Sequence, residues 1–370
     1  MFKKRVLGII LSAAVLFGGC AAAESGDTSS SANQSSSAVS SSAAESTDAS
    51  GEISDAGSAT DPDASYPVTI KNYTAPEGVA TWTEKEHTYE SAPKRILVNT
   101  RPAAELLLHL GLKDRIVGVS AVFGAADEAV SADFDTLNEM STSYIGKEVA
   151  LSVDPDIVVS RGGLFDNADW GVGTVDSLND MDIATYALGT SVTGGTFDTV
   201  YEDIENLGKI FAVNEQAEAF AATLRERQTA VEEKLAVIDT DQTFAYLHMS
   251  DPEEVSIYSA YGETFFASIF KMVRLENTFA DVQGDVSLEA LIEADPDVII
   301  VPEWESYGNE ENGVQSVINS LLENPKLSGM KAIQNKAVYA VDYNHMFGYG
   351  YQSLDGVEKL AQTMYPELFE

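Results

Sequence analysis

Two stretches of this chain have almost the same seven residues: VDPDIVV at 153–159 and ADPDVII at 294–300. The helix-forming stretch GKEVALSV leads into the first Asp-Pro pair, and VSLEALIEA leads into the second. Proline disfavours helical backbone at the residue before it, so each pair should end a helix. The β-branched, apolar run that follows is typical of a strand buried on both faces of a parallel sheet. A repeated unit of helix, stop and buried strand predicts two similar lobes.

The sequence around the first copy has a β-α-β rhythm. The apolar strand KRILVNT is followed by the helix PAAELLLHLGL, which has Pro102 in its first turn and Gly111 at its end, and then by the strand DRIVGVS. This order indicates a parallel sheet covered by helices. We therefore predict an α/β fold of two Rossmann-like lobes with parallel central sheets, joined by a single long helix, with a ligand cleft between the lobes.

A long helical stretch separates the two copies. From Asn214, a candidate cap, apolar residues recur every three or four positions as far as Ile238. Unbroken from Glu215 to Ile238, this helix would be about 36 Å long. We interpret it as a stiff connection that belongs to neither core. The predicted divisions are an N-terminal lobe at 66–195, a connecting helical region at 196–238 and a C-terminal lobe at 239–370.

The N-terminus predicts export and anchoring. Three basic residues at positions 3–5 precede an apolar run too short to cross a bilayer easily, so residues 1–19 are expected to be a signal peptide. The run leads to LFGGC, which resembles a bacterial lipobox with Cys20 as the lipidated residue. The alternative is a free thiol after an ordinary cleavage site. Residues 20–65, rich in Ser and Ala, predict a lipidated, disordered tether. The expected location is the extracellular face of a bacterial cell membrane.

Composition excludes several functions. The 370 residues carry a formal net charge of −37, so nucleic acid is not an expected partner, because phosphate binding requires clustered Lys and Arg. Cys20 is the only cysteine, which excludes disulfides and argues against thiolate metal or catalytic sites.

The ordered set APKRILVNTRPAAELLLHLGLKDRIVGVS, LSVDPDIVVS, LEALIEADPDVIIV, NPKLSGMKAIQNKAVYAVD and LAQTMYPELF resembles one known family. It is similar to the helical-backbone (class III) substrate-binding proteins of ABC transporters, which deliver ferric siderophores, haem or cobalamin. The resemblance covers nearly all of residues 93–370. It implies a non-enzymatic protein that captures an iron complex, expected here to be a ferric siderophore, and passes it to a permease dimer with a cytoplasmic ATPase. No cofactor beyond the bound chelate is expected.

The resemblance also implies two docking residues. In this family one surface glutamate on each lobe, seven residues before the proline of the repeated motif, contacts arginines of the permease. Those positions hold Glu148 and Glu289. Each glutamate also falls in the first turn of a predicted helix, where the helix dipole favours negative charge without any partner.

Ligand residues should come from loops that follow strands, since open α/β sheets bind ligands beyond the carboxyl ends of their strands. Arginine and aromatic side chains there suit a bulky, partly anionic chelate. His345, expected in a polar loop, could contact the metal. The candidates are Arg101, Arg161, Phe165, Trp170, Tyr261, Trp304, Tyr307, His345 and Tyr349.

Other functions remain to be weighed. Haem or cobalamin could replace the siderophore in the same fold. A zinc or manganese receptor needs about three converging histidines and a carboxylate, and the chain has four histidines in all. A Rossmann-like enzyme lacks support, because no P-loop, G-x-G-x-x-G after a strand or G-x-S-x-G elbow occurs.

Overall fold

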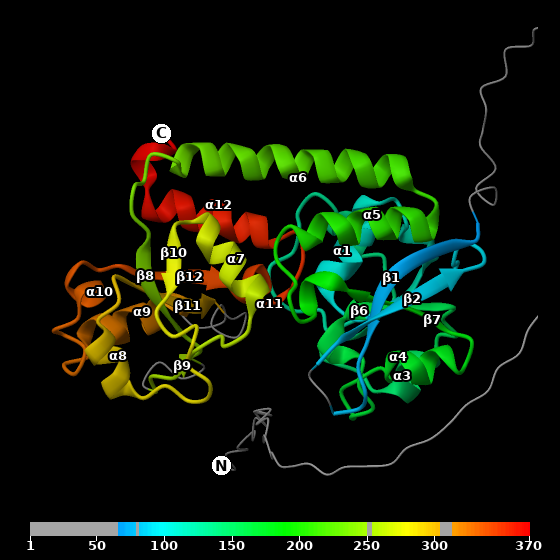
Figure 1. The fold of residues 1–370 in the computed structure, drawn as a ribbon, viewed down its shortest axis with the longest axis horizontal. Helices are drawn as coiled ribbons and strands as arrows, with labels where there is room; N and C mark the ends of the chain where they lie inside the picture. The colour runs from blue at the N-terminus through cyan, green and yellow to red at the C-terminus, as the bar shows by residue number, and fades with distance from the viewer. Residues whose placement is uncertain (1–65, 79–80, 250–253, 304–312) are drawn as a thin grey trace, which may run out of the picture. The chain divides into compact units, whose positions relative to one another are not determined.

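The computed structural model describes residues 66–78, 81–249, 254–303 and 313–370 (Figure 1). The predicted signal peptide and tether, including Cys20, lie outside the described residues, as do the candidates Trp304 and Tyr307. None of the helices in the described ranges combines the length and apolar character that crossing a membrane requires.

A five-stranded parallel sheet forms the centre of the N-terminal lobe, in the order β5-β4-β3-β6-β7. The strands are β3 (Ile96–Val98), β4 (Ile116–Ser120), β5 (Glu139–Ser141), β6 (Ile157–Arg161) and β7 (Ala184–Leu188). The helices are α1 (Arg101–His109), α2 (Ser131–Phe134), α3 (Lys147–Leu151) and α4 (Val175–Asn179), with 3₁₀ turns η2 (Lys113–Arg115), η3 (Gly162–Leu164) and η4 (Gly189–Ser191). All three residues of β3 are fully buried, as expected of a strand covered on both faces.

An antiparallel hairpin, β1 (Val68–Thr74) and β2 (Thr83–Tyr89), precedes this sheet. The buried side chain of Asn72 donates to the carbonyl of Thr185 at 2.6 Å and accepts from the backbone N–H of Ala187 at 3.1 Å. The hairpin thus supplies hydrogen-bond partners to the edge strand β7, whose outer backbone groups would otherwise be unpaired.

The C-terminal lobe has a second parallel sheet, in the order β10-β8-β11-β12, with β9 pairing antiparallel to β8. Its strands are β8 (Gln242–Leu247), β9 (Ile257–Tyr258), β10 (Leu275–Asn277), β11 (Val298–Glu303) and β12 (Val338–Asp342). Its helices are α7 (Thr264–Met272), α8 (Leu288–Ala294), α9 (Gly313–Glu323), α10 (Lys331–Gln334), α11 (Tyr343–Phe347) and α12 (Ser353–Met364), followed by η6 (Pro366–Leu368). The predicted fold class of two α/β lobes with parallel sheets is confirmed.

The repeated heptads occupy equivalent places in the two lobes. Helix α3 leads to Asp154 and strand β6, and helix α8 leads to Asp295 and strand β11. Both aspartates have left-handed backbone, with φ of 50° and 47°. Asp and Asn tolerate this conformation better than most residues, and the following proline excludes a return to helix.

The second aspartate of each motif binds the backbone at the start of the neighbouring strand. Asp156 accepts from the N–H groups of Lys94 and Arg95 at 2.8 and 2.9 Å, just before β3. Asp297 accepts from the N–H and hydroxyl of Thr243 at 3.1 and 2.9 Å, in β8. The motif is therefore repeated because in each lobe it ends a helix and aligns two parallel strands.

The connection between the lobes is two helices, α5 (Thr199–Phe211) and α6 (Asn214–Leu235), separated at Ala212, whose φ of 54° is left-handed. With 22 residues, α6 is about 33 Å long. Asn214, the expected cap, is its first helical residue, and the cap position is taken by Val213, whose side chain makes no capping bond. The expectation that this region belongs to neither core is wrong. The apolar face of α5 is buried in the main hydrophobic cluster, and α6 adds five buried residues to that cluster, Ala217, Ala221, Leu224, Val231 and Leu235.

That main cluster continues through both lobes. It contains Leu107 and Phe211 from the N-terminal side and Phe244 and Leu354 from the C-terminal side. Helix α6 runs along α12 in Figure 1, and its Arg227 pairs with Asp355 and Glu358 of α12. The lobes are thus joined along α6 and α12 by apolar packing as well as by the chain.

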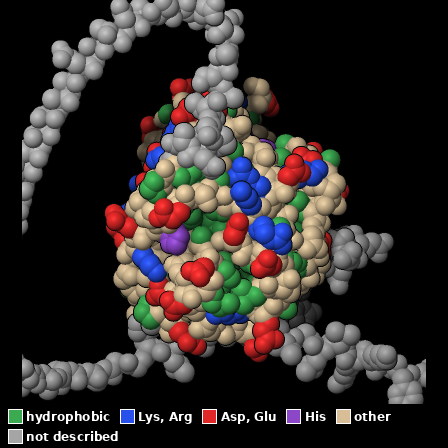
Figure 2. Space-filling view, turned by 90° about the vertical axis from the view of Figure 1, so that its right-hand side faces the viewer, with side chains coloured by type: hydrophobic (Ala, Val, Ile, Leu, Met, Phe, Trp, Pro, Cys, Tyr) green, Lys and Arg blue, Asp and Glu red, His purple; other side chains and the backbone are tan. Residues whose placement is uncertain are grey.

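The acidic excess of the sequence lies on the surface. On the face drawn in Figure 2, acidic side chains are scattered among Lys, Arg and hydrophobic groups. Such mixed charge favours solubility.

Removing either second aspartate of the motif should destabilise its lobe. Asp156→Ala and Asp297→Ala each remove an acceptor of two hydrogen bonds, so each should lower the free energy of unfolding by about 1–3 kcal/mol. Urea unfolding followed by circular dichroism measures the change. Asp281→Ala, at an exposed carboxylate, is the control and should have little effect. Equal stability of all three variants would contradict the assigned role.

Candidate ligand-binding site

The guanidinium of Arg161, the last residue of β6, contacts both lobes. Its Nη1 donates to the carbonyl oxygen of Phe347 at 3.0 Å, and its Nη2 donates to the hydroxyl of Tyr144 at 2.9 Å. The charge of Arg161 also interacts with Tyr343, which together with Tyr144 and Tyr349 favours the charged form of the guanidinium. The guanidinium carbon lies 5.6 Å from the ring of Tyr144 and 5.8 Å from the ring of Tyr349. Arg161 is therefore a cation surrounded by tyrosines from two lobes.

Tyr349, which follows α11, is held from several directions. Its backbone is left-handed, with φ of 50°, which is uncommon for a bulky residue. Its carbonyl accepts from the hydroxyl of Thr190 in η4 at 2.7 Å, and its own hydroxyl donates to Glu263 at 3.0 Å. Strained backbone of this kind persists where surrounding contacts fix it, and it concentrates at functional sites.

More aromatic rings lie next to these residues. Phe347 is within 6 Å, centroid to centroid, of Tyr258, His248 and Tyr343. Burial lowers the pKa of His248, which favours the neutral imidazole. The ring of Phe123 lies 5.6 Å from that of Tyr144, centroid to centroid. We call this group the aromatic site: Phe123, Tyr144, Arg161, His248, Tyr258, Tyr343, Phe347 and Tyr349.

Asp203 of α5 fixes the turn that contacts Tyr349. Its buried carboxylate accepts from the hydroxyl of Tyr186 at 2.8 Å and from the N–H groups of Gly189 and Thr190 at 2.8 and 3.2 Å. Desolvation raises the pKa of Asp203 to about 6, although these three donors oppose the shift. A residue of the connecting helices thus positions a loop of the site.

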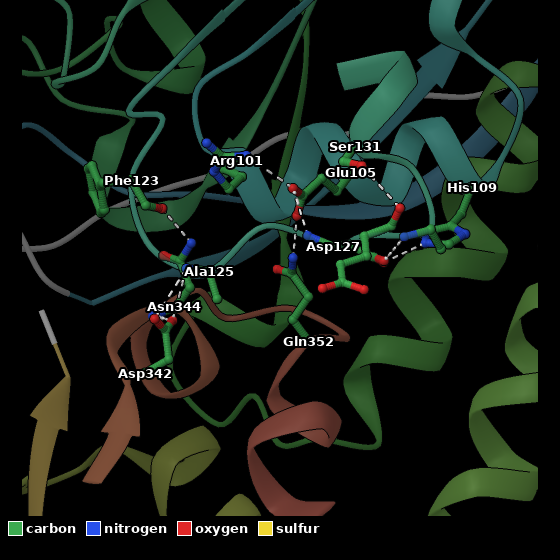
Figure 3. A network of polar contacts seen from close by, with 12 residues as sticks. Arg101, Glu105, His109, Phe123, Ala125, Asp127, Ser131, Asp342, Asn344 and Gln352 are labelled. Atoms are coloured by element: carbon green, nitrogen blue, oxygen red, sulfur yellow. Dashed lines mark hydrogen bonds and ion pairs between the residues drawn. The ribbon is translucent and has the colours of Figure 1, made fainter. Parts of the chain in front are cut away.

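A separate polar network joins the lobes beside α1 (Figure 3). The buried carboxylate of Glu105 accepts from the side chain of Gln352, and Asp127 accepts from the hydroxyl of Tyr351 at 2.6 Å. Asp127 also pairs with His109 at 2.7 Å, and this partner holds the pKa of Asp127 well below its usual range. These contacts fix how residues after α11 meet the N-terminal lobe.

Two further contacts in Figure 3 lie closer to the aromatic site. The side-chain amide of Asn344 donates to the carbonyl of Phe123, and the N–H of Ala125 donates to the carboxylate of Asp342 at 3.2 Å. The loop after β4 is thereby bound to the start of α11.

Of the candidates that lie within the described residues, the structure brings Arg161 and Tyr349 together. Arg101 pairs with Glu105 at 3.3 Å, and its guanidinium lies 4.4 Å from the ring of Phe134, so it faces the polar network instead. Phe165 is buried in a cluster beneath the N-terminal sheet, Trp170 is half-buried and Tyr261 is 53 % exposed.

His345 does not lie in a polar loop, as expected, but is buried in α11. It lines a small, mostly apolar cavity with residues of α7 and α12, among them Phe270, Val357 and Leu360. Burial lowers its pKa. The helix forms because Asp342 caps it by accepting from the N–H of Asn344 at 2.8 Å, a local signal that the sequence carries.

Tyr144 and Phe347 were not among the candidates. Tyr144 lies between the short edge strand β5 and helix α3, a strand that the sequence analysis did not predict, and the tertiary fold brings it to Arg161. Within the described ranges, which hold all four histidines, His, Cys, Asp and Glu side chains form no group of three or more suited to a metal ion.

The two predicted docking glutamates have the same local setting. Glu148 is the second residue of α3 and Glu289 the second residue of α8, and both are exposed. Both helices lie on the lower side of their lobes in Figure 1.

Comparison with known proteins decides the family. Residues 98–344 match the family model described as periplasmic binding protein. The chain belongs to this family. The resemblance found in the sequence is confirmed, and the protein is a binding protein and not an enzyme.

Two curated relatives show how far the similarity extends. The chain is 22% identical over 307 residues to an uncharacterized ABC transporter substrate-binding lipoprotein, YvrC, of Bacillus subtilis, covering 82% of this chain and 88% of that protein. It is 25% identical over 218 residues to a cobalamin-binding protein of Halobacterium salinarum, covering 58% of this chain and 55% of that one.

Solved structures share the fold. A periplasmic binding protein from Veillonella parvula superposes with a TM-score of 0.70 at 21% identity, covering 81% of this chain and 99% of that one. A protein of an ABC-type Fe3+-hydroxamate transport system from Saccharomonospora viridis superposes with a TM-score of 0.62 at 23% identity, covering 81% of this chain and 99% of that one.

Replacing Asp203 should change how stability depends on pH. Because its pKa is raised from 3.8 to about 6, the folded protein holds a proton between these values that the unfolded chain releases. Its contribution to stability is therefore largest below about pH 4 and falls as pH rises to 6. Asp203→Asn should be less stable than the parent, by a margin that shrinks between pH 4 and pH 7.

Urea unfolding of both proteins at four pH values across this range measures the margin. A difference that grew with rising pH would contradict the raised pKa.

Proposed function

We propose that this protein is the extracellular, lipid-anchored receptor of an ABC importer and captures a bulky metal chelate at the aromatic site. Family membership and the similarity to an ABC transporter lipoprotein support the importer role. Cys20 after a short apolar run supports anchoring, since two or more acyl chains hold a protein stably on a membrane.

The observation that carries the proposal is the position of Arg161. Its guanidinium lies at the carboxyl end of a parallel strand, where ligands of such sheets bind, and it contacts residues of both lobes. A ligand with negatively charged oxygens would replace the carbonyl of Phe347 as its partner. Capture would then exchange a contact between the lobes for a contact with the ligand.

A ferric siderophore is the first candidate ligand. Its metal-binding oxygens carry negative charge for Arg161, and its bulk suits the ring faces of Tyr144, Tyr349 and Phe347. The similarity to an Fe3+-hydroxamate transport protein supports this choice at the level of the fold. Arg101 no longer contributes to it, because Glu105 already neutralises that cation.

Cobalamin is the second candidate, and a specific observation favours it. Relatives named cobalamin-binding proteins align over 218 residues at 25% identity. A corrin is also large and flat, so aromatic side chains can pack on it.

We further propose that Glu148 and Glu289 orient the protein on a two-subunit permease. Both are exposed, occupy the same helix position and lie on separate lobes. Paired carboxylates that face basic side chains of a partner steer the diffusional encounter of the two proteins and fix their relative orientation.

Removing the central cation should weaken binding. Arg161→Ala should raise the Kd for ferrioxamine E or cyanocobalamin, whichever the parent binds, by about tenfold or more, because a charged hydrogen-bond donor is lost. Quenching of intrinsic fluorescence measures the Kd. Arg101→Ala should change it by less than about threefold, and Lys271→Ala, at an exposed site on α7, is the control. Unchanged affinity in Arg161→Ala would place the ligand elsewhere.

Docking can be separated from capture. The double variant Glu148→Gln and Glu289→Gln should keep the parental Kd but reduce uptake of the labelled chelate at least tenfold in cells that carry the cognate permease. The matched control changes two exposed glutamates of α6, Glu218→Gln and Glu233→Gln. Normal uptake by the first double variant would reject the docking role and leave the helix dipole as the reason for both glutamates.

A further inference from the structure

Glu263 holds two tyrosines of the aromatic site with one carboxylate. Its Oε1 accepts from the hydroxyl of Tyr258 at 3.2 Å, and its Oε2 accepts from the hydroxyl of Tyr349 at 3.0 Å. Tyr258 comes from β9 and Tyr349 from the segment after α11, so residues far apart in the chain meet at this group.

The carboxylate sits on a fixed element. Glu263 is the cap residue of α7, where the helix dipole favours negative charge, and its carbonyl accepts from Ala267 at 3.0 Å. The next residue, Thr264, donates its hydroxyl to the carbonyl of Gly195 in the N-terminal lobe at 2.6 Å. Phe265 packs 5.5 Å from the ring of Tyr349. The position of Glu263 is therefore set by contacts with both lobes.

The bonds to Glu263 determine what the tyrosines can offer a ligand. A tyrosine hydroxyl has one proton, and an ionised carboxylate can only accept. When both protons are given to Glu263, the oxygens of Tyr258 and Tyr349 have only lone pairs left. Burial, and after it the charge of Glu263, raises the pKa of both tyrosines, so they stay protonated at neutral pH.

Arg161 has the polarity opposite to that of the two tyrosine oxygens. Arg161, 5.8 Å from the ring of Tyr349, can only donate. A donor close to two acceptors defines a ligand that carries both kinds of group.

We propose that Glu263 is a positioning residue that makes the hydroxyl oxygens of Tyr258 and Tyr349 hydrogen-bond acceptors. The aromatic site then selects chelates that carry N–H or O–H donors, an inference that rests on the proposed function. Such a chelate places negatively charged or carbonyl oxygens at Arg161 and an amide or hydroxyl donor at the two tyrosines. A chelate whose edge carries only carboxylates can still pair with Arg161, but it meets repulsion at Glu263 and finds no donor at the two tyrosines.

Three probes test this selection. Ferrioxamine E and cyanocobalamin carry amide groups, whereas the periphery of haemin at pH 7.5 carries carboxylates and no N–H. The parent should bind at least one amide-bearing probe more tightly than haemin. Glu263→Gln should weaken that probe about tenfold and haemin less than threefold, because the glutamine amide makes one tyrosine a donor. Glu276→Gln, an exposed carboxylate in the same lobe, is the control. Equal weakening of all probes would overturn the selection.

A double-mutant cycle separates positioning from a structural effect. In the background Tyr258→Phe and Tyr349→Phe, where the rings remain and the hydroxyls are absent, Glu263→Gln should have no further effect on amide-bearing probes. The same loss in both backgrounds would show that Glu263 does not act through the hydroxyls.

A measurement without ligand distinguishes this inference from the proposed function. In protein whose tyrosines are labelled with 13C at the ζ carbon, the signals of Tyr258 and Tyr349 are assigned with the single Phe variants, and these two signals should shift in Glu263→Gln. Signals that do not move would overturn the inference even if chelates bind. Signals that move in a protein that binds none of the probes would instead reject the proposed ligands.

Discussion

The structure depends on an aspartate that aligns two parallel strands in each lobe. Parallel strands buried on both faces have few polar groups with which to set their register, and their N-terminal ends need hydrogen-bond acceptors. Asp156 and Asp297 supply these at the starts of β3 and β8. Once the amino ends are fixed, the carboxyl ends present their loops at a common edge, where Arg161 and the residues after β12 lie.

Loops at that edge are fixed by contacts that cross between the lobes. Tyr349 is the clearest case, since it binds Thr190 of one lobe and Glu263 of the other while keeping a strained backbone. Asp203 extends this support into the connecting helices. The connection is accordingly a part of the core that also holds the site, which explains why its apolar face is so deeply buried.

The sequence predicted the site less completely than the fold. Arg161 was found because it follows a buried apolar run directly, so the end of the strand fixes its place. Arg101 satisfied the same rule, yet the side chain of Glu105, one helical turn later, draws its guanidinium away. His345 was placed wrongly because the cap that Asp342 gives to a short helix was overlooked, and that helix turns the imidazole into the core. Glu263 and Tyr144 carry no signal of their own, because tertiary packing brings Tyr349 to Glu263 and Arg161 to Tyr144.

By itself, the sequence determined the two lobes, the parallel sheets, the break at each Asp-Pro pair and the family, since these follow from local backbone preferences, from burial patterns and from an ordered set of motifs. The tertiary structure alone decided which side chains meet. Hydrogen bonds such as Thr190 to Tyr349 or Arg161 to Phe347 depend on how loops from two lobes pack, and packing is a property of the whole chain that no single stretch of sequence encodes.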